Sequence, residues 1–250
     1  MKDSIIAVIL AAGKGTRMKS ELPKVATLLA GKPLIQHVID NLKLAGVTKI
    51  VVVVGYKKEV VINLLSNEHE IEFAEQKEQL GTGHALLSTE SILVNYHGQI
   101  LVCCGDVPLI SGNSFRSLIN HHVESKNGAT VLSADMPNPK GYGRIIRDKN
   151  DKLLFIVEEK DANEDEKKVS EINTGTYVFE SPKVFEYLKT IKTNNAQGEY
   201  YLPDLIKIYR ENQYNVDASL LKNSVESSGV NSPEDLQYLN SILEESKVSL

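Results

Sequence analysis

The chain has 250 residues and a formal net charge of −5, with 42% hydrophobic and 24% charged residues. This composition fits one large folded domain and excludes a wholly disordered, collagen-like or coiled-coil chain. The apolar run at residues 5–12 has eight residues, whereas a transmembrane helix needs about 20. The negative net charge also argues against a general nucleic-acid or membrane surface. We therefore expect neither nucleic acid nor a membrane among the partners.

The only two cysteines, Cys103 and Cys104, are adjacent in the chain. Two neighbouring cysteines make a poor disulfide framework, so we expect the protein in the reducing cytoplasm. No histidine or other base stands close to Cys104 in the sequence, which makes it a poor candidate for a nucleophile.

Positive charge is concentrated near the N-terminus. Residues 13–32 carry a net charge of +4, which leaves −9 for the rest of the chain. The basic residues there are Lys14, Arg17, Lys19, Lys24 and Lys32, against Glu21. A positive segment in an acidic protein indicates a bound polyanion, but charge alone leaves a solvated surface loop equally open.

Short runs rich in Val and Ile alternate with helical patterns over the first half of the chain. We expect strands at 5–10, 50–54, 71–74, 100–104 and 129–134. Apolar residues recur at helical spacing after Pro33 until Gly46, and further helices are expected at 60–65, 84–93 and 115–123. Such alternation predicts an α/β fold with a mostly parallel sheet and helices on both faces.

The pattern changes after about residue 135. Residues 145–146, 153–157 and 176–179 are expected as strands without long helices between them, which predicts a small mixed β extension. Helices are expected at 182–191 and 203–210. A last helix is expected after Ser232, with Ser232 as its N-cap. The charged stretch 158–168 is expected to be a mobile surface loop.

A glycine-containing turn, A-A-G-K-G-T-R-M, follows the first expected strand. Such a turn lets backbone N–H groups approach a phosphate closely. Met18 stands where the dinucleotide fingerprint G-x-G-x-x-G requires Gly or Ala, and the P-loop pattern is also absent. The turn therefore indicates a phosphate site of another kind.

Residues 10–25, L-A-A-G-K-G-T-R-M-K-S-E-L-P-K-V, resemble the signature of the sugar-1-phosphate nucleotidyltransferases. That resemblance implies a Rossmann-like, GT-A-like nucleotide-diphospho-sugar transferase fold. It also implies that the loop wraps a nucleoside triphosphate through Leu10, Ala11, Ala12 and Gly13. Arg17 and Lys24 match the family's phosphate-contacting cations, which stabilise negative charge on the departing pyrophosphate.

Residues 76–85, Q-K-E-Q-L-G-T-G-H-A, resemble the uracil-reading segment of the uridylyltransferase domains in bifunctional enzymes that make UDP-N-acetylglucosamine. A side-chain amide such as Gln76 offers both a donor and an acceptor to the uracil edge. Gly81 and Thr82 lie beside it in the motif. The alternative for Gln76 is a cap or surface residue. His84 is expected to be structural.

Asp106 follows the expected strand 100–104, at the sheet edge where open α/β sheets bind ligands. The resemblance implies that Asp106 binds Mg²⁺ jointly with Asn231, in the segment G-V-N-S. Carboxylate and amide oxygens suit this hard cation. The alternatives are a turn cap for Asp106 and a cap of the last helix for Asn231.

The sugar side resembles the family in several short motifs. The expected sugar-contacting residues are Cys104, Gly105, Gly143, Glu158, Asn173 and Tyr201. The chain departs from many relatives at two positions near the sugar: Cys104 replaces a tyrosine and Pro203 a threonine. These departures leave the exact sugar open.

The resemblance implies Mg²⁺-dependent transfer of a uridylyl group from UTP to N-acetylglucosamine 1-phosphate. The alternatives are the same reaction on glucose 1-phosphate or another sugar 1-phosphate, a glycosyltransferase of similar fold, and a non-catalytic nucleotide-sugar sensor. No second acid accompanies Asp106, as a glycosyltransferase's D-x-D motif would require. We expect a catalytic domain at 1–231, a C-terminal helix at 232–250 and no hexapeptide-repeat acetyltransferase domain. A monomer or dimer is expected rather than the trimer of repeat-bearing relatives.

Overall fold

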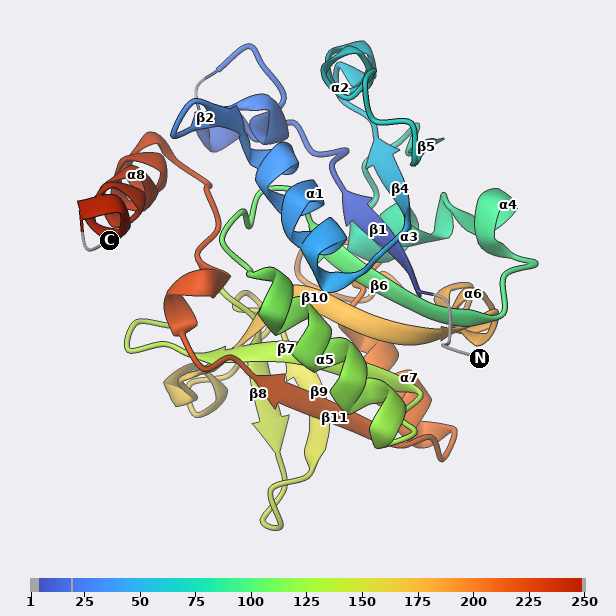
Figure 1. The fold of residues 1–250 in the computed structure, drawn as a ribbon. Helices are drawn as coiled ribbons and strands as arrows, with labels where there is room; N and C mark the ends of the chain where they lie inside the picture. Colours follow the sequence, from blue (N-terminus) through green and yellow to red (C-terminus); the bar gives the residue numbers. More distant parts are fainter. Residues whose placement is uncertain (1–4, 19, 249–250) are drawn as a thin grey trace.

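The fold is described from a computed structural model, which places residues 5–18 and 20–248. Figure 1 shows a twisted central sheet with helices against its two faces. In the main sheet the strands follow the order β11-β7-β10-β6-β1-β4-β5. The parallel pairs are β1 with β4, β1 with β6, β4 with β5 and β7 with β11, and β10 runs antiparallel to both of its neighbours.

The strand bounds follow the Val- and Ile-rich runs of the sequence. The seven strands of the main sheet are β1 (Ile5–Leu10), β4 (Lys49–Val54), β5 (Ile71–Glu75), β6 (Gly98–Cys104), β7 (Ala129–Asp135), β10 (Glu171–Ser181) and β11 (Val216–Leu220). The small extension consists of β8 (Arg144–Arg147) and β9 (Leu153–Val157), which joins the sheet through β8 and β10. The mostly parallel α/β fold with a mixed extension is confirmed.

Alternation along β1 explains why both faces of the sheet are covered. Ala7 and Ile9 belong to a core with α1 (Leu34–Ala45), α2 (Lys58–Leu64) and α5 (Gly112–Glu124). Ile6 and Val8 belong to the opposite core, with α3, α4, α6 and α7. These helices span Thr82–Leu87, Glu90–Leu93, Lys183–Leu188 and Asp204–Glu211. A strand buried on both faces reads as a continuous apolar run, as β1 does.

A third, smaller core joins the chain's last helix to its N-terminal segment. Helix α8 (Pro233–Val248) contributes Leu239 to a cluster with Met18 and Leu29. The hairpin of β2 (Leu28–Leu29) and β3 (Lys32–Pro33) lies beside it, and Ala30 N donates to Asn240 Oδ1 at 3.0 Å. Helix α8 therefore supports the segment that carries Arg17.

Some expected elements were wrong in their details. The expected helix 84–93 is two short helices, because Ser88 and Thr89 hydroxyls donate to the carbonyls of His84 and Leu86 and compete with helix hydrogen bonds. Strand β10 extends well beyond the expected 176–179. Its pairing with β7 shifts register between Asn173 and Thr176 and then continues to Glu171. Strand β11 was not expected at all.

The charged stretch 158–168 was expected to be a surface loop. Most of it is exposed, with a 3-10 helix at Glu166–Lys168. Ala162, however, is buried, and Glu158 is only partly exposed because it faces a cavity described below. Within the described residues, no helix is both long enough and apolar enough to cross a bilayer.

Candidate active site

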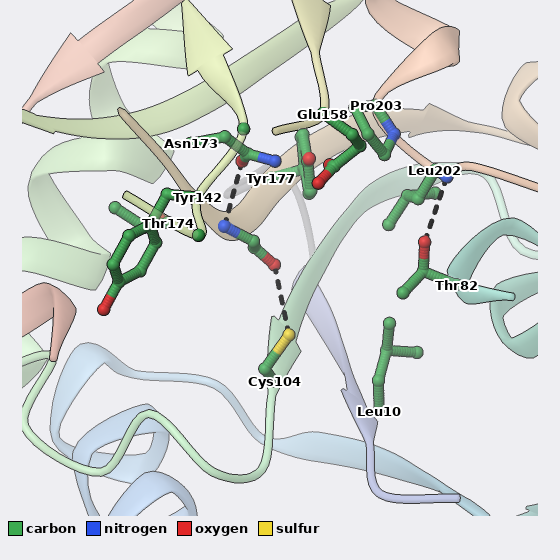
Figure 2. A pocket seen from close by; sticks show the side chains of 13 residues that line it. Leu10, Thr82, Cys104, Tyr142, Glu158, Asn173, Thr174, Tyr177, Leu202 and Pro203 are labelled. Carbon is green, nitrogen blue, oxygen red and sulfur yellow. Dashed lines mark hydrogen bonds between the residues drawn. The ribbon is translucent and has the colours of Figure 1, made fainter. Parts of the chain in front are cut away.

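Two adjoining cavities lie at the carboxyl ends of β1 and β6. The first, which we call the glycine-loop pocket, has a volume of about 240 Å³. The second, the β10 pocket, has a volume of about 190 Å³ and lies against β10 and the extension (Figure 2). Leu10, Thr82 and Cys104 line both cavities. One ligand can therefore extend from one pocket into the other.

Nine of the residues expected to bind the nucleotide or its metal line the glycine-loop pocket, whereas Arg17 and Asn231 do not. The nine are Leu10, Ala11, Ala12, Gly13, Gln76, Gly81 and Thr82, together with Lys24 and Asp106. A Cβ added at Gly13 would meet no atom within 4 Å, so the backbone of this turn faces open space. The pocket thus leaves room for a ligand to approach the main chain.

Gln76 is 3% exposed, which makes the interpretation as a surface residue wrong. Its Nε2 donates to Gly81 O at 3.1 Å and lies 3.1 Å from His84 Nδ1. His84 thus contacts the amide of Gln76 from its partly buried position. These contacts fix the amide of Gln76 at the wall of the pocket.

Lys24 lies at the centre of the charged part of the glycine-loop pocket. Its Nζ forms an ion pair with Asp106 Oδ2 and donates to Asn231 Oδ1 at 3.1 Å. Arg17 Nη2 donates to the same Asn231 oxygen at 3.0 Å. The sequence separates these residues widely, and the fold brings all four together. Lys19 lies outside the described residues.

Asn231 is oriented from α8. Its N–H and that of Ser232 donate to Asp235 Oδ2 at 2.8 and 2.9 Å, while Asp235 N donates to Ser232 Oγ at 3.2 Å. This reciprocal capping box confirms Ser232 as the N-cap. Because Ser232 does the capping, the Asn231 side chain is free to contact Lys24 and Arg17.

The Asp106 and Asn231 oxygens fit a divalent cation. Both bind one positive group, the Lys24 ammonium, which shows that the two oxygens converge. Oxygen ligands of this kind suit Mg²⁺, which usually keeps waters and substrate phosphates as its remaining ligands. Among residues 5–18 and 20–248, no three His, Cys, Asp or Glu side chains form a metal-holding cluster. A metal here would depend on the substrate for further ligands.

The β10 pocket brings together four of the residues expected to contact the sugar: Cys104, Gly143, Glu158 and Asn173. Figure 2 shows Glu158 and Asn173 on one side of the cavity and Cys104 opposite them, at the end of β6. Asn173 N donates to Gly143 O at 2.9 Å, and a Cβ on Gly143 would lie 3.1 Å from Glu158 Oε1. A carboxylate and an amide in a small cavity are suited to sugar hydroxyls.

Burial and neighbouring charges perturb the acids of this region. Burial, followed by the negative charges of Asp161, Asp204 and Glu199, raises the pKa of Glu158 to about 7. Burial likewise raises the pKa of the Cys104 thiol to about 12, helped by Asp106. Cys104 is therefore a neutral thiol at neutral pH, and its Sγ donates to Gly175 O at 3.7 Å. This agrees with the expectation that it is no nucleophile.

Four expected site residues do not line either of these two pockets: Gly105, Tyr201, Arg17 and Asn231, the last of which contacts Lys24 as described above. Gly105 packs beneath the pockets, where a Cβ would meet Val25 Cγ1 at 3.0 Å. Tyr201 lines a neighbouring cavity of about 260 Å³ that shares Glu158. Arg17 is exposed and reaches the site only through Asn231. The positions of these residues in the sequence could not show that they lie outside the pocket walls.

Residues 6–235 match the family described as Nucleotidyl transferase. The chain belongs to the nucleotidyl transferase family. It is 51% identical over 237 residues, 95% of this chain, to the bifunctional protein GlmU of Streptococcus sanguinis strain SK36, and 51% identical over 225 residues to that of Streptococcus pyogenes serotype M3. The chain spans about half the length of these relatives, 51% and 48%.

The fold is also that of a solved sugar nucleotide enzyme. A structure described as UDP-glucose pyrophosphorylase complexed with UDP-glucose superposes with a TM-score of 0.79. The superposition covers 97% of this nucleotidyl transferase and 99% of that chain, at 19% sequence identity. At this identity the match concerns the fold.

The structure adds lining residues that were not expected. They are Val25, Gln79, Ala85 and Glu199 in the glycine-loop pocket, and Gly141, Tyr142, Thr174, Gly175, Tyr177 and Leu202 in the β10 pocket. Pro203, which is expected near the sugar, also lines the β10 pocket. Gln79 stands inside the segment 76–85, which already carried the resemblance. The apolar lining residues could not be predicted, because in the sequence they cannot be distinguished from residues of the hydrophobic core.

Proposed function

We propose that this nucleotidyl transferase makes UDP-N-acetylglucosamine and pyrophosphate from UTP and N-acetylglucosamine 1-phosphate, with Mg²⁺ as cofactor. The observation that carries the proposal is the pair of adjoining pockets. One is lined by the Lys24 cation, the Asp106 carboxylate and the buried amide of Gln76, and the other by a carboxylate and an amide. The 50–51% identity to bifunctional GlmU proteins supports the choice of nucleotide and sugar.

In the proposed reaction an oxygen of the sugar phosphate attacks the α-phosphorus of UTP in line. The new P–O bond forms as the bond between the α-phosphorus and its bridging oxygen to the β-phosphorus breaks, and pyrophosphate departs with that electron pair. The attacking phosphate is already ionised, so no general base is required. The protein's contribution is then positioning and charge neutralisation.

Each part of the site has a task in this scheme. The backbone at Gly13 lies against the triphosphate, and Gln76 orients the uracil. Lys24 and Arg17 stabilise the charge on the departing pyrophosphate. Asp106 and Asn231 would hold Mg²⁺, which supplies further positive charge at the phosphates. Glu158 and Asn173 accept and donate hydrogen bonds at the sugar.

The test is pyrophosphate release with a panel of nucleoside triphosphates and sugar 1-phosphates, with Mg²⁺ and with excess EDTA. The proposal expects the highest kcat/KM with UTP and N-acetylglucosamine 1-phosphate, and no turnover in EDTA. A higher kcat/KM with glucose 1-phosphate would replace the sugar and keep the chemistry, a result that Cys104 and Pro203 in the β10 pocket make worth testing. Tight UTP binding without any pyrophosphate release would make the chain a sensor instead.

We propose the cytoplasm as the place of this reaction. Cys103 and Cys104 are both free thiols in the structure, and Cys103 is buried. A reducing compartment keeps them so.

A further inference from the structure

Residues 195–202, which we call the strap, are bound to the loop that lines the glycine-loop pocket. Tyr200 N donates to Leu80 O at 2.8 Å, and Tyr200 O accepts from Gly83 N at 2.7 Å. Leu202 N donates to Thr82 Oγ1 at 3.1 Å (Figure 2). The approach is close, because a Cβ on Gly81 would lie 2.7 Å from Tyr200 O. The strap therefore follows any movement of residues 80–83.

The opposite edge of the strap is bound by the carboxylate of Asp161, beside which Lys160 Nζ donates to Gln197 Oε1 at 2.8 Å. Asp161 Oδ1 accepts from Ala196 N at 2.8 Å, and its Oδ2 accepts from the Tyr201 hydroxyl at 3.2 Å. Gln197 Nε2 donates to the same hydroxyl at 2.9 Å and ties the two contacts together. Asp161 comes three residues after Glu158 of the β10 pocket, so it joins the strap to the sugar side.

The strap also forms part of both cavities. Glu199 lines the glycine-loop pocket, and Leu202 lines the β10 pocket. Asp161 lines neither of these pockets. Inside the strap, Asn195 Nδ2 donates to Glu199 O at 2.6 Å and Asn195 Oδ1 accepts from Glu199 N at 3.1 Å. These bonds make the strap a preformed loop that can move as a unit.

We propose that Asp161 is a positioning residue that couples the two pockets through the strap, so that UTP and the sugar 1-phosphate each strengthen binding of the other. The ligands named here rest on the proposed function. A nucleotide that orders residues 80–83 also orders the strap. The sugar 1-phosphate then binds a β10 pocket whose strap residues are already ordered, so its binding costs less conformational entropy. Asp161 transmits this order because it holds the strap against the segment that carries Glu158.

The test measures pyrophosphate release over a matrix of UTP and sugar 1-phosphate concentrations for the wild type, Asp161→Ala, Asp161→Asn and Asp165→Ala. The readout is the factor by which saturating UTP lowers the KM of the sugar 1-phosphate. We expect a factor of about 5 or more in the wild type. In Asp161→Ala it falls to about 1, while kcat changes by less than about 3-fold, since Asp161 touches no reacting group.

The two other variants distinguish the loss of the strap contacts from the loss of negative charge and from a general effect of substitution in this segment. Asp161→Asn keeps an oxygen for the Ala196 N–H but removes the negative charge that raises the pKa of Glu158. It should retain a measurable part of the factor. Asp165 is exposed on the same segment and pairs only with Lys168 through its side chain among the contacts described, so Asp165→Ala should match the wild type.

An unchanged factor in Asp161→Ala would overturn the proposal. Equal losses in Asp161→Ala and Asp161→Asn would also overturn it, because the effect would then come from charge at Glu158. A wild type that releases no pyrophosphate would refute the proposed function alone. In that case calorimetry reads the coupling directly, as the change in the Kd of UTP on adding N-acetylglucosamine 1-phosphate.

Discussion

Three side chains from distant parts of the sequence form the charged centre of the site. Lys24 begins a 3-10 helix before α1, Asp106 follows β6, and Asn231 precedes α8. The Lys24 ammonium contacts both partners. Both Lys24 and Asp106 keep 18% of their side-chain surface accessible. The cation is therefore paired in the free protein but remains open to a phosphate ligand.

We expect Lys24→Ala and Asp106→Ala each to lower kcat by about 10²-fold or more, the usual effect of removing a preorganised charge from a transition state. Pyrophosphate release at saturating substrates measures it. The matched control is Lys32→Ala, since Lys32 is an exposed lysine that pairs with Asp40 away from the pockets. A near-wild-type kcat in either site variant would remove that residue from the mechanism.

Glu158 makes the β10 pocket sensitive to pH near neutrality. Its pKa of about 7 means that the carboxylate, the better acceptor for sugar hydroxyls, forms as the pH rises through 7. We expect kcat/KM for the sugar 1-phosphate to rise through this range in the wild type. In Glu158→Gln the part of this rise that comes from ionisation of Glu158 disappears. The sugar phosphate's own ionisation affects both proteins equally, so their ratio isolates Glu158.

The same pKa has the opposite consequence for stability. The pKa of Glu158 is higher in the folded protein than its ordinary value of 4.5, so the folded state binds more protons between these two values. The contribution of Glu158 to stability is complete below about pH 4.5 and is lost as the pH rises through 7. Relative to the wild type, Glu158→Gln should gain in Tm from pH 5 to pH 8. A constant difference in Tm would refute the raised pKa.

At the scale of elements, the sequence predicts best what depends on local pattern. The Val- and Ile-rich runs, the Gly46 stop of α1 and the Ser232 cap of α8 correspond to observed features. Strand β11 differs from the continuous apolar runs of the buried strands, because Asp217 and Ser219 alternate with apolar residues, the pattern of a strand with one exposed face. This alternation is local, whereas the place of the strand at the edge of the sheet depends on its pairing with β7.

In the candidate site, too, the residues that lie close together in the sequence could be predicted best. The glycine loop and the 76–85 segment are continuous in sequence, so their residues could be assigned together. The β10 pocket instead depends on a bulge, where Gly175 has φ +76° and its N–H donates to Asn173 Oδ1 at 2.9 Å. Bulges of this kind reorient a side chain, and only the pairing of β10 with β7 locates this one.

Gly81 immediately precedes α3 and lines the glycine-loop pocket. Its φ of +110° favours glycine, and a Cβ would lie 2.7 Å from Tyr200 O. We expect Gly81→Ala to raise the KM for UTP by about 10-fold or more and to lower the free energy of unfolding by about 1–3 kcal/mol, the usual range for backbone strain. Steady-state kinetics and urea denaturation measure the two effects.

Gly46→Ala is the matched control for Gly81→Ala. Gly46 also has a positive φ, +94°, but a Cβ there would meet nothing within 4 Å. It should lose stability and leave the KM for UTP unchanged. If both variants raise this KM alike, the effect comes from general destabilisation, and Gly81 has no special part in shaping the pocket.

At the scale of the whole molecule, one sheet carries both pockets. The glycine-loop pocket lies at the ends of the parallel strands β1, β5 and β6, and the β10 pocket lies against β10 and its extension. Strand β10 joins β6 through an antiparallel ladder. The two large cores cover opposite faces, and each includes residues from both halves of the sheet. Because neither half has a core of its own, we expect the chain to unfold in a single cooperative transition.

Ligand binding at one pocket should therefore stabilise the entire chain. At 100 times its Kd, UTP with Mg²⁺ adds about 2.7 kcal/mol to the free energy of unfolding. For a chain of this size that corresponds to a rise in Tm of about 5–10 °C. Differential scanning calorimetry should show one transition that shifts as a whole, and Lys24→Ala should lose most of the shift at the same UTP concentration. A transition that splits in two on adding UTP would mean that the halves of the sheet unfold separately, and the coupling between the pockets would then depend on the strap alone.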